Sequence, residues 1–312
     1  MWLAALVGAA GLVALLLWWR WPRPEAPAAA APLAAPMSTP VAASAPVIAT
    51  PAGFPAFTVE QLRAEPPGSD WLVRWLAGET QVLVIEFPDL PAQGRALNRV
   101  AALVEKSGGA RDRVLADAEL LALIRASGDT EASFFLGHDY RATDLARFFT
   151  LAAAQHVALN ADEQRLRVLL AQARLLNEAQ PGSFTGAEPG ALVSFSAANP
   201  AAARPDERID ALRRASVMEH ELSHGRFFTD TAYREHCGFF WRQLLTEPER
   251  EAWRRYLASQ GYDRGNEELM INETQALLMH TPDTRDFNAA QLRWSDAELE
   301  GLRERFRLGL AR

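Results

Sequence analysis

The first 19 residues of the chain, MWLAALVGAAGLVALLLWW, carry no charged side chain, and this run limits what the N-terminus can fold into. As an α-helix it would be about 28 Å long, close to the hydrocarbon thickness of a bilayer. Trp18, Trp19 and Trp21 cluster at one end, where aromatic residues meet a membrane interface. A buried soluble helix and a cleaved signal peptide are the alternatives. The run is long for a signal peptide, and the Ala-x-Ala sequences where a signal peptidase could cleave lie among prolines. Residues 1–21 are therefore predicted to form an uncleaved transmembrane helix.

The next segment, residues 22–56, holds nine prolines among alanines, serines and threonines, with Glu25 as its only acidic residue. Such a segment cannot bury enough apolar surface to fold, and its prolines stiffen it, so we expect a disordered linker. A stiff spacer of this kind is typical of the exported side of bacterial membranes, although Arg20 and Arg23 favour the opposite orientation under the positive-inside rule. We predict a single-pass protein of the bacterial inner membrane whose folded part is periplasmic.

Residues 57–312 are long enough for one globular domain. The hydrophobic fraction of the chain, 49%, is sufficient for such a domain to form a core. The formal net charge of −7 gives no support for nucleic-acid binding, and we expect no such partner. The single cysteine, Cys237, excludes an intramolecular disulfide.

Hydrophobic periodicity predicts that helices dominate this domain. Residues 80–90 are β-branched and apolar, and residues 190–198 alternate, so both favour strands. Helical patterns occur at 93–106, 113–126, 141–159, 161–179, 205–225, 230–245, 247–260, 265–280 and 289–308. Many helices with a few short strands indicate an α+β fold.

One predicted helix contains VMEHELSHGRFF, in which His220, Glu221 and His224 match the pattern H-E-x-x-H. On a helix, residues i and i+4 lie on one face, so both imidazoles can reach one ion, and neutral imidazole suits Zn²⁺. Glu221 would point toward a water at the metal and could accept its proton. The alternative is an ordinary helix with polar residues, but without a metal these inward groups would need other partners.

The residues before the motif support a helix here. Pro205, Asp206 and Glu207 form a favourable first turn, with proline at an early position and acids at the positive end of the helix dipole. From Ile209 onward, apolar residues recur on the face that carries the histidines, and Gly225 is expected to end the pattern.

A zinc site needs a third protein ligand, and the sequence offers three candidates. Asp230 lies six residues after His224, and His236 lies twelve residues after it. Glu273 lies in an otherwise apolar helical face, where a carboxylate is costly unless it is paired or bound to a metal. The alternative for Glu273 is a buried pair with an arginine. We predict Zn²⁺ bound by His220, His224 and Glu273.

With Glu273 downstream, the motif resembles the gluzincin branch of the zincin metallopeptidases over about residues 190–280. The resemblance implies a zincin-like catalytic domain in which His220, His224 and Glu273 bind zinc and Glu221 is the general base.

The dipeptide Asn272-Glu273 is similar to the Asn-Glu of thermolysin-like enzymes, but their acidic residue four positions after the ligand is Leu277 here. The resemblance also implies an edge strand that aligns an extended peptide, for which ALVSFS, residues 191–196, is the candidate.

A further group should stabilise charge in the transition state. His280 is predicted to do so, because it lies two turns after Glu273 on the same helical face. Tyr233, His236 and Tyr262 are the other candidates, and each could instead have a packing role.

Residues His138, Asp139 and Tyr140 are expected in a loop between apolar runs. They could form a wall of the substrate cleft or an exposed helix cap.

Together these features predict a membrane-anchored zinc metallopeptidase that hydrolyses peptide bonds in a peptide or protein substrate, with Glu221 as general base. One alternative is a non-catalytic zinc-binding interaction domain, although a structural site has no use for Glu221. Another is an amidase that acts on cell-wall peptide.

Overall fold

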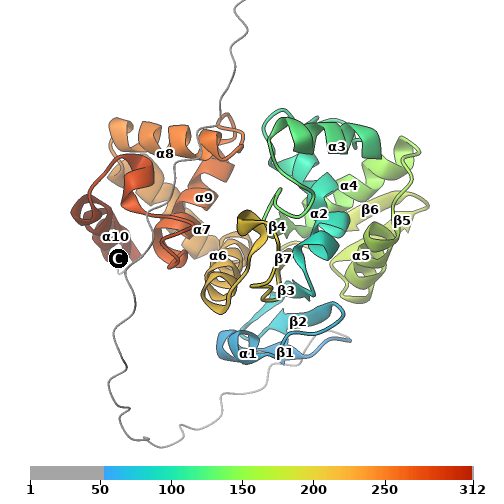
Figure 1. The fold of residues 1–312 in the computed structure, drawn as a ribbon. Helices are drawn as coiled ribbons and strands as arrows, with labels where there is room; N and C mark the ends of the chain where they lie inside the picture. Colours follow the sequence, from blue (N-terminus) through green and yellow to red (C-terminus); the bar gives the residue numbers. More distant parts are fainter. Residues whose placement is uncertain (1–52, 311–312) are drawn as a thin grey trace, which may run out of the picture. The chain divides into compact units, whose positions relative to one another are not determined.

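The computed structural model describes residues 53–310 of the chain (Figure 1). Helices predominate, and the strands form one mixed sheet and one hairpin, which confirms the predicted helix-dominated α+β class. The predicted anchor over residues 1–21 and most of the predicted linker over 22–56 lie outside the described residues. Within the described residues, no helix is long and apolar enough to cross a bilayer.

The main sheet has the strand order β1-β2-β3-β7-β4. Its strands are β1 (Ala56–Phe57), β2 (Leu72–Leu76), β3 (Glu79–Phe87), β4 (Gly137–Arg141) and β7 (Ala191–Ser196). β7 runs parallel to β3 and antiparallel to β4, with Asp139 opposite Val193. β7 is therefore an interior strand, and the expectation that residues 191–196 form the edge is wrong. β4 forms that edge.

Helices cover both faces of the sheet, which is why its central strands are apolar on both sides. Leu83 and Ile85 of β3 belong to the core under α2, whereas Val82 and Val84 pack toward α6 on the opposite face. Figure 1 shows α2 and α6 on the two sides of β3 and β7. The helices before α6 are α1 (Val59–Ala64), α2 (Leu90–Val104), α3 (Asp117–Ala126), α4 (Ala142–Ala154) and α5 (Ala161–Gln172).

Residues 173–186 correct the helix predicted over 161–179. α5 ends at Gln172, and Arg174 adopts the left-handed conformation with φ of 59°. The chain then forms an antiparallel hairpin of β5 (Leu176–Gln180) and β6 (Ser183–Gly186). β5 buries only its first residue, so its sequence carries no alternating pattern that would predict a strand.

α6 (Ala211–Thr229) packs against β3, β4 and β7 of the sheet. The predicted helix over 205–225 is displaced, because Pro205–Glu207 form a separate 3₁₀ turn. Gly225 does not end α6. It lies inside the helix, where a Cβ atom would come within 2.7 Å of a Val82 methyl group. Glycine at this position therefore permits the close approach of α6 to β3.

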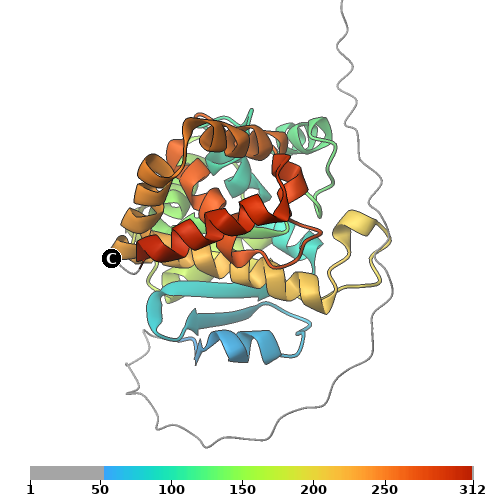
Figure 2. The ribbon, with the colours of Figure 1, turned by 90° about the vertical axis from the view of Figure 1, so that its left-hand side faces the viewer.

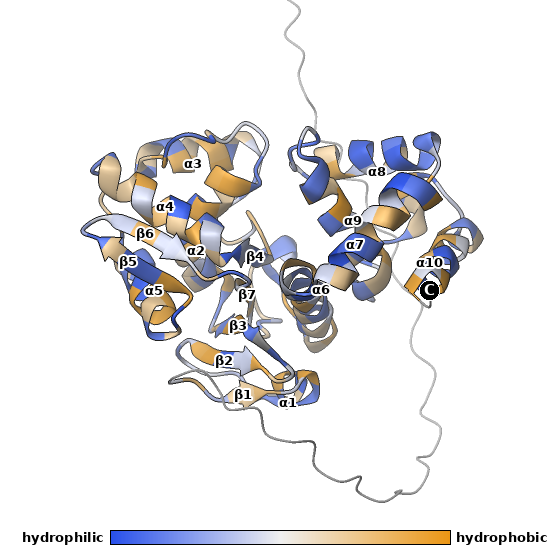
Figure 3. Cartoon of the chain, turned by 180° about the vertical axis from the view of Figure 1, so that it is seen from behind, coloured by the Kyte–Doolittle hydropathy of each residue, from blue (hydrophilic) through white to orange (hydrophobic). Residues whose placement is uncertain are grey.

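The helices from Thr231 onward lie together on one side of the molecule (Figure 2), and their apolar side chains form a second core beside α6. Its elements are α7 (Thr231–Phe239), a π-helical turn (Phe240–Leu244), α8 (Glu247–Ser259), α9 (Glu267–His280), a 3₁₀ turn (Ala289–Leu292) and α10 (Asp296–Leu310). The predicted helix over 230–245 is thus one helical segment that ends in the π-helical turn, whereas the one predicted over 289–308 is divided in two. Most of α8 is hydrophilic (Figure 3), yet it contributes the fully buried Trp253 to this core.

α9 lies at the centre of this second core and packs against α6, α7, α8 and α10. Every residue from Met270 to Leu278 is buried. A helix enclosed in this way has no solvated face, so its polar side chains must find partners inside the protein.

Candidate metal centre

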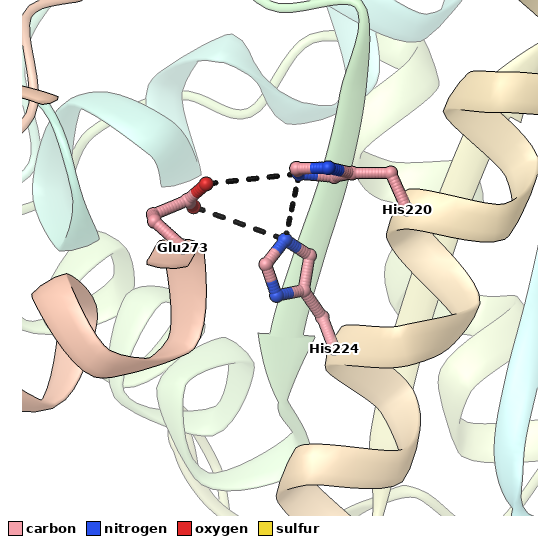
Figure 4. A group of neighbouring side chains, drawn as sticks. All are labelled: His220, His224 and Glu273. Carbon is pink, nitrogen blue, oxygen red and sulfur yellow. Dashed lines mark hydrogen bonds and ion pairs between the residues drawn. The ribbon is translucent and has the colours of Figure 1, made fainter. Parts of the chain in front are cut away.

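α6 carries His220 and His224 one turn apart, and α9 brings Glu273 to the same point (Figure 4). The Nε2 atoms of the two histidines are 3.0 Å apart. Glu273 Oε2 lies 3.6 Å from His220 Nε2, and Glu273 Oε1 lies 3.8 Å from His224 Nε2. Ligands at about 2.0–2.1 Å from a tetrahedral zinc ion are roughly 3.3 Å from one another. The three donors therefore have the spacing that a single ion requires.

Burial leaves these donors short of hydrogen-bond partners. Glu273 and His224 are each 1% exposed, and Glu273 Oε2 accepts no hydrogen bond from the described residues. A buried carboxylate oxygen without a partner is destabilising. A cation among these donors would remove that cost, so the residues fit a metal ion.

Burial also favours the neutral, metal-binding form of both imidazoles. It lowers the pKa of His220 to about 4 and the pKa of His224 to about 4. Burial raises the pKa of Glu273, although His224 and a hydrogen bond from Tyr262 oppose this. His220 Nδ1 is 2.8 Å from Thr281 Oγ1, and this hydrogen bond fixes the ring with Nε2 toward the other donors.

Glu221 lies next to the three donors without being one of them. It is buried, and its Oε2 has no hydrogen-bond partner among the described residues. Its side chain lies against Gly137 of β4, where a Cβ atom would be 2.1 Å from Glu221 Oε1. Burial raises the pKa of Glu221, and the Glu273 and Glu105 carboxylates raise it further. A carboxylate with a raised pKa and a free oxygen is suited to accept a proton.

Asp139 is a site residue that sequence reasoning placed in a loop, and that prediction is wrong. Asp139 lies in β4, and its Oδ1 is 3.7 Å from His224 Nε2. Its Oδ2 accepts a hydrogen bond of 3.3 Å from Asn272 Nδ2. Asp139, Glu221 and His224 offer ligand atoms within 4.8 Å of one another. The edge strand therefore adds a second carboxylate to the metal centre.

The two neighbours of Asp139 point to the other face of β4, as strand alternation requires. His138 and Tyr140 are both buried, so they do not form an exposed helix cap. His138 Nδ1 is 2.9 Å from the Tyr140 hydroxyl, which also hydrogen-bonds Glu105. Burial lowers the pKa of His138 to about 3, so its ring is neutral.

The other two candidates for the third ligand lie elsewhere. Asp230 is the N-cap of α7, where its side chain accepts a hydrogen bond from the Tyr233 backbone. The ring of His236 packs edge-on against Phe306, with 4.5 Å between the centroids. Of the three candidates, Glu273 is the one that the fold brings to the two histidines.

The predicted helper His280 lies at the C-terminal end of α9. Its Nε2 is 3.0 Å from the Tyr233 hydroxyl, which donates to Gln275 Oε1 at 2.7 Å. The Tyr262 hydroxyl hydrogen-bonds the Glu273 carboxylate. Tyr262 therefore orients a donor directly, whereas the hydrogen bonds of His280 go to Tyr233.

Comparison of the chain with protein-family models, curated proteins and solved structures gives no match.

Proposed function

We propose that this chain is a zinc-dependent metallopeptidase with a zincin-like catalytic domain. The observation that carries this proposal is the convergence of three donors from two helices, with an unpaired carboxylate beside them. His220 and His224 of α6 meet Glu273 of α9, and Glu221 lies next to this group with a free oxygen. A structural zinc site is closed by four protein ligands, whereas a catalytic site has three and keeps the fourth position open for water; Glu221 is proposed to act beside that position as a base rather than as a ligand.

Zinc bound by His220, His224 and Glu273 would supply a Lewis acid that lowers the pKa of water and polarises a carbonyl. Glu221 then accepts the proton of the attacking water and delivers it to the leaving amine. The buried surroundings of Glu221 suit both steps, because its raised pKa permits it to hold the proton between them. Tyr262 orients Glu273 through its hydrogen bond, and Asp139 lies beside His224.

The substrate backbone is proposed to lie along β4. Among residues 53–310 this strand is terminal in the sheet, so one side of its backbone has no strand partner there. Its residue Asp139 approaches His224, so a peptide paired with β4 would pass close to the metal centre. β4, rather than residues 191–196, is therefore proposed as the edge strand that aligns the peptide.

The decisive comparison is between the full chain and Glu221→Gln after zinc reconstitution. Both proteins should bind one zinc per chain, because Glu221 is not one of the three proposed ligands, His220, His224 and Glu273. The parent should cleave casein or a mixed peptide library, and the variant should be slower by a factor on the order of 10²–10⁴. Peptidoglycan digestion alongside separates a general peptidase from a cell-wall amidase.

Cleavage at equal rates by both proteins at matched zinc content would exclude Glu221 as the base. A parent that binds zinc and hydrolyses neither casein, the library nor peptidoglycan would favour the non-catalytic zinc-binding domain instead.

A further inference from the structure

A pocket of about 310 Å³ lies at the C-terminal end of β4, beyond the metal centre. Five segments meet around it: the end of β4, the start of α4, the loop before β7, the end of α6 and the start of α7. The residues that give it its chemistry are Arg141, Thr143, Glu188, Phe228, Thr231 and Arg234.

Two arginines dominate the charge of this pocket. The Arg141 guanidinium lies over the Phe228 ring, 4.7 Å from its centroid, and makes an ion pair with Glu268. Arg234 donates to the Phe228 carbonyl at 3.1 Å and to Thr231 Oγ1 at 3.4 Å, and among residues 53–310 it pairs with no carboxylate. A guanidinium has five N–H donors, so both arginines keep donors for a ligand.

The acidic groups near the two arginines are Glu188, Glu268 and Asp144, and the Asp144 carboxylate is stabilised by the Arg141 charge, whereas Arg234 pairs with none of them. Glu188 is the one acidic residue of the lining, and it is exposed, so solvent screens its charge. Glu268 engages one Nη atom of Arg141 and is itself 58% exposed. The Thr143 and Thr231 hydroxyls add neutral donors at the same place.

The position of Arg141 relates this pocket to the metal centre. Arg141 and Asp139 are two residues apart in β4, so their side chains leave the same face of the strand about 7 Å apart. Asp139 in turn reaches within 3.7 Å of His224 Nε2. A peptide lying along β4 with a bond at the metal centre would therefore place a residue about two positions away beside Arg141.

We propose that the pocket binds a carboxylate of the substrate, about two residues from the bond that is cleaved. Arg141 and Arg234 would bind this carboxylate through bidentate hydrogen bonds, and the Phe228 ring supports the Arg141 guanidinium that lies over it. The carboxylate is either an aspartate or glutamate side chain or a free C-terminus. This selectivity for acidic peptides presupposes the peptidase activity proposed above.

The test uses the zinc-loaded full chain and alanine-based peptides in which glutamate or glutamine is scanned through each position, with free and amidated C-termini. The parent should cleave one glutamate peptide, or the free-acid series, about 10-fold or more faster in kcat/KM than its neutral counterpart. Arg234→Gln should bring this ratio close to one, and Arg234→Glu should favour lysine in place of glutamate. Arg255→Gln, an exposed arginine of α8 outside the pocket, is the matched control and should keep the parent's ratio.

Binding separates this inference from the peptidase proposal. Fluorescently labelled glutamate and glutamine peptides are titrated with Glu221→Gln and with the same protein carrying Arg234→Gln, and anisotropy is measured. Tighter binding of an acidic peptide, weakened about 10-fold by Arg234→Gln, supports the pocket even if the parent cleaves nothing. Equal binding and equal cleavage of acidic and neutral peptides at every position would overturn it while leaving any observed peptidase activity standing.

Discussion

Glu273 is the residue on which the donor set depends, because it is the only donor from α9. Replacing it by alanine should weaken zinc binding on the order of 100-fold or more, since one of three protein ligands is lost. Competition with a chromophoric chelator measures this affinity. His236→Gln is the control, because His236 packs on Phe306 away from the donors and its loss should leave zinc affinity unchanged. Parent-like affinity in Glu273→Ala would place the third ligand elsewhere.

The two site histidines should make the zinc-free chain sensitive to acid. Burial lowers the pKa of His224 to about 4, against about 6.5 in the unfolded chain, so between these values the unfolded state binds the extra proton. Stability from this histidine is fully present above pH 6.5 and is lost as the pH falls toward 4. At pH 4.5 the loss should be on the order of 2 kcal/mol.

Urea unfolding of the zinc-free parent and of His224→Gln at pH 7 and pH 4.5 tests this. The buried carboxyls, whose pKa values are raised, titrate in both proteins, so their contribution largely cancels in the comparison. The parent should lose more stability than the variant. An identical loss in both would show that His224 is not buried as described.

At the scale of secondary structure, the two glycines Gly225 and Gly301 provide a matched pair. In α6, a Cβ atom on Gly225 would lie 2.7 Å from Val82 Cγ1, whereas in α10 a Cβ atom on Gly301 would meet nothing within 4 Å. Gly301→Ala should therefore stabilise the fold by roughly 0.5–1 kcal/mol through helix propensity. Gly225→Ala should destabilise it by about 1–2 kcal/mol, because overpacking outweighs the same gain. Stabilisation by both changes, measured by urea unfolding, would mean that α6 does not lie this close to the sheet.

The elements that the sequence predicted well are the long amphipathic ones. The patterns over 247–260 and 265–280 correspond to α8 and α9 within two residues. β4 was missed because Gly137 and Asp139 are poor strand formers, and its strand state comes from pairing with β7. Such pairing between distant segments leaves no local signal.

The same distinction applies to the metal centre. His220, Glu221 and His224 could be predicted because one helix fixes their spacing within a single turn. Glu273 could be proposed from the cost of a carboxylate on an apolar face, and α9 does bury it. Asp139 could not be predicted, because its approach to His224 depends on the register between β4 and β7.

At the scale of the whole molecule, the predictions that concern the membrane fall on residues 1–21 and 22–56. We expect residues 1–21 to hold the protein in the inner membrane with residues 57–312 in the periplasm. Alkaline phosphatase fused after residue 312 should be active, because it folds only outside the cytoplasm. Deletion of residues 1–21 should abolish this activity and release the protein from the membrane fraction. An inactive full-length fusion, with a cytoplasmic reporter active at the same point, would reverse the orientation.

The donors come from segments far apart in the chain: the histidines lie in α6 and Glu273 lies in α9, about 50 residues later. A zinc ion bound by donors from both helices would link α6 to α9, much as a disulfide links two segments. This link would close a loop of the chain that contains α7 and α8. A protease cut in the connection between α8 and α9, residues 260–266, would then leave two fragments held together by the ion as well as by the apolar core that both share.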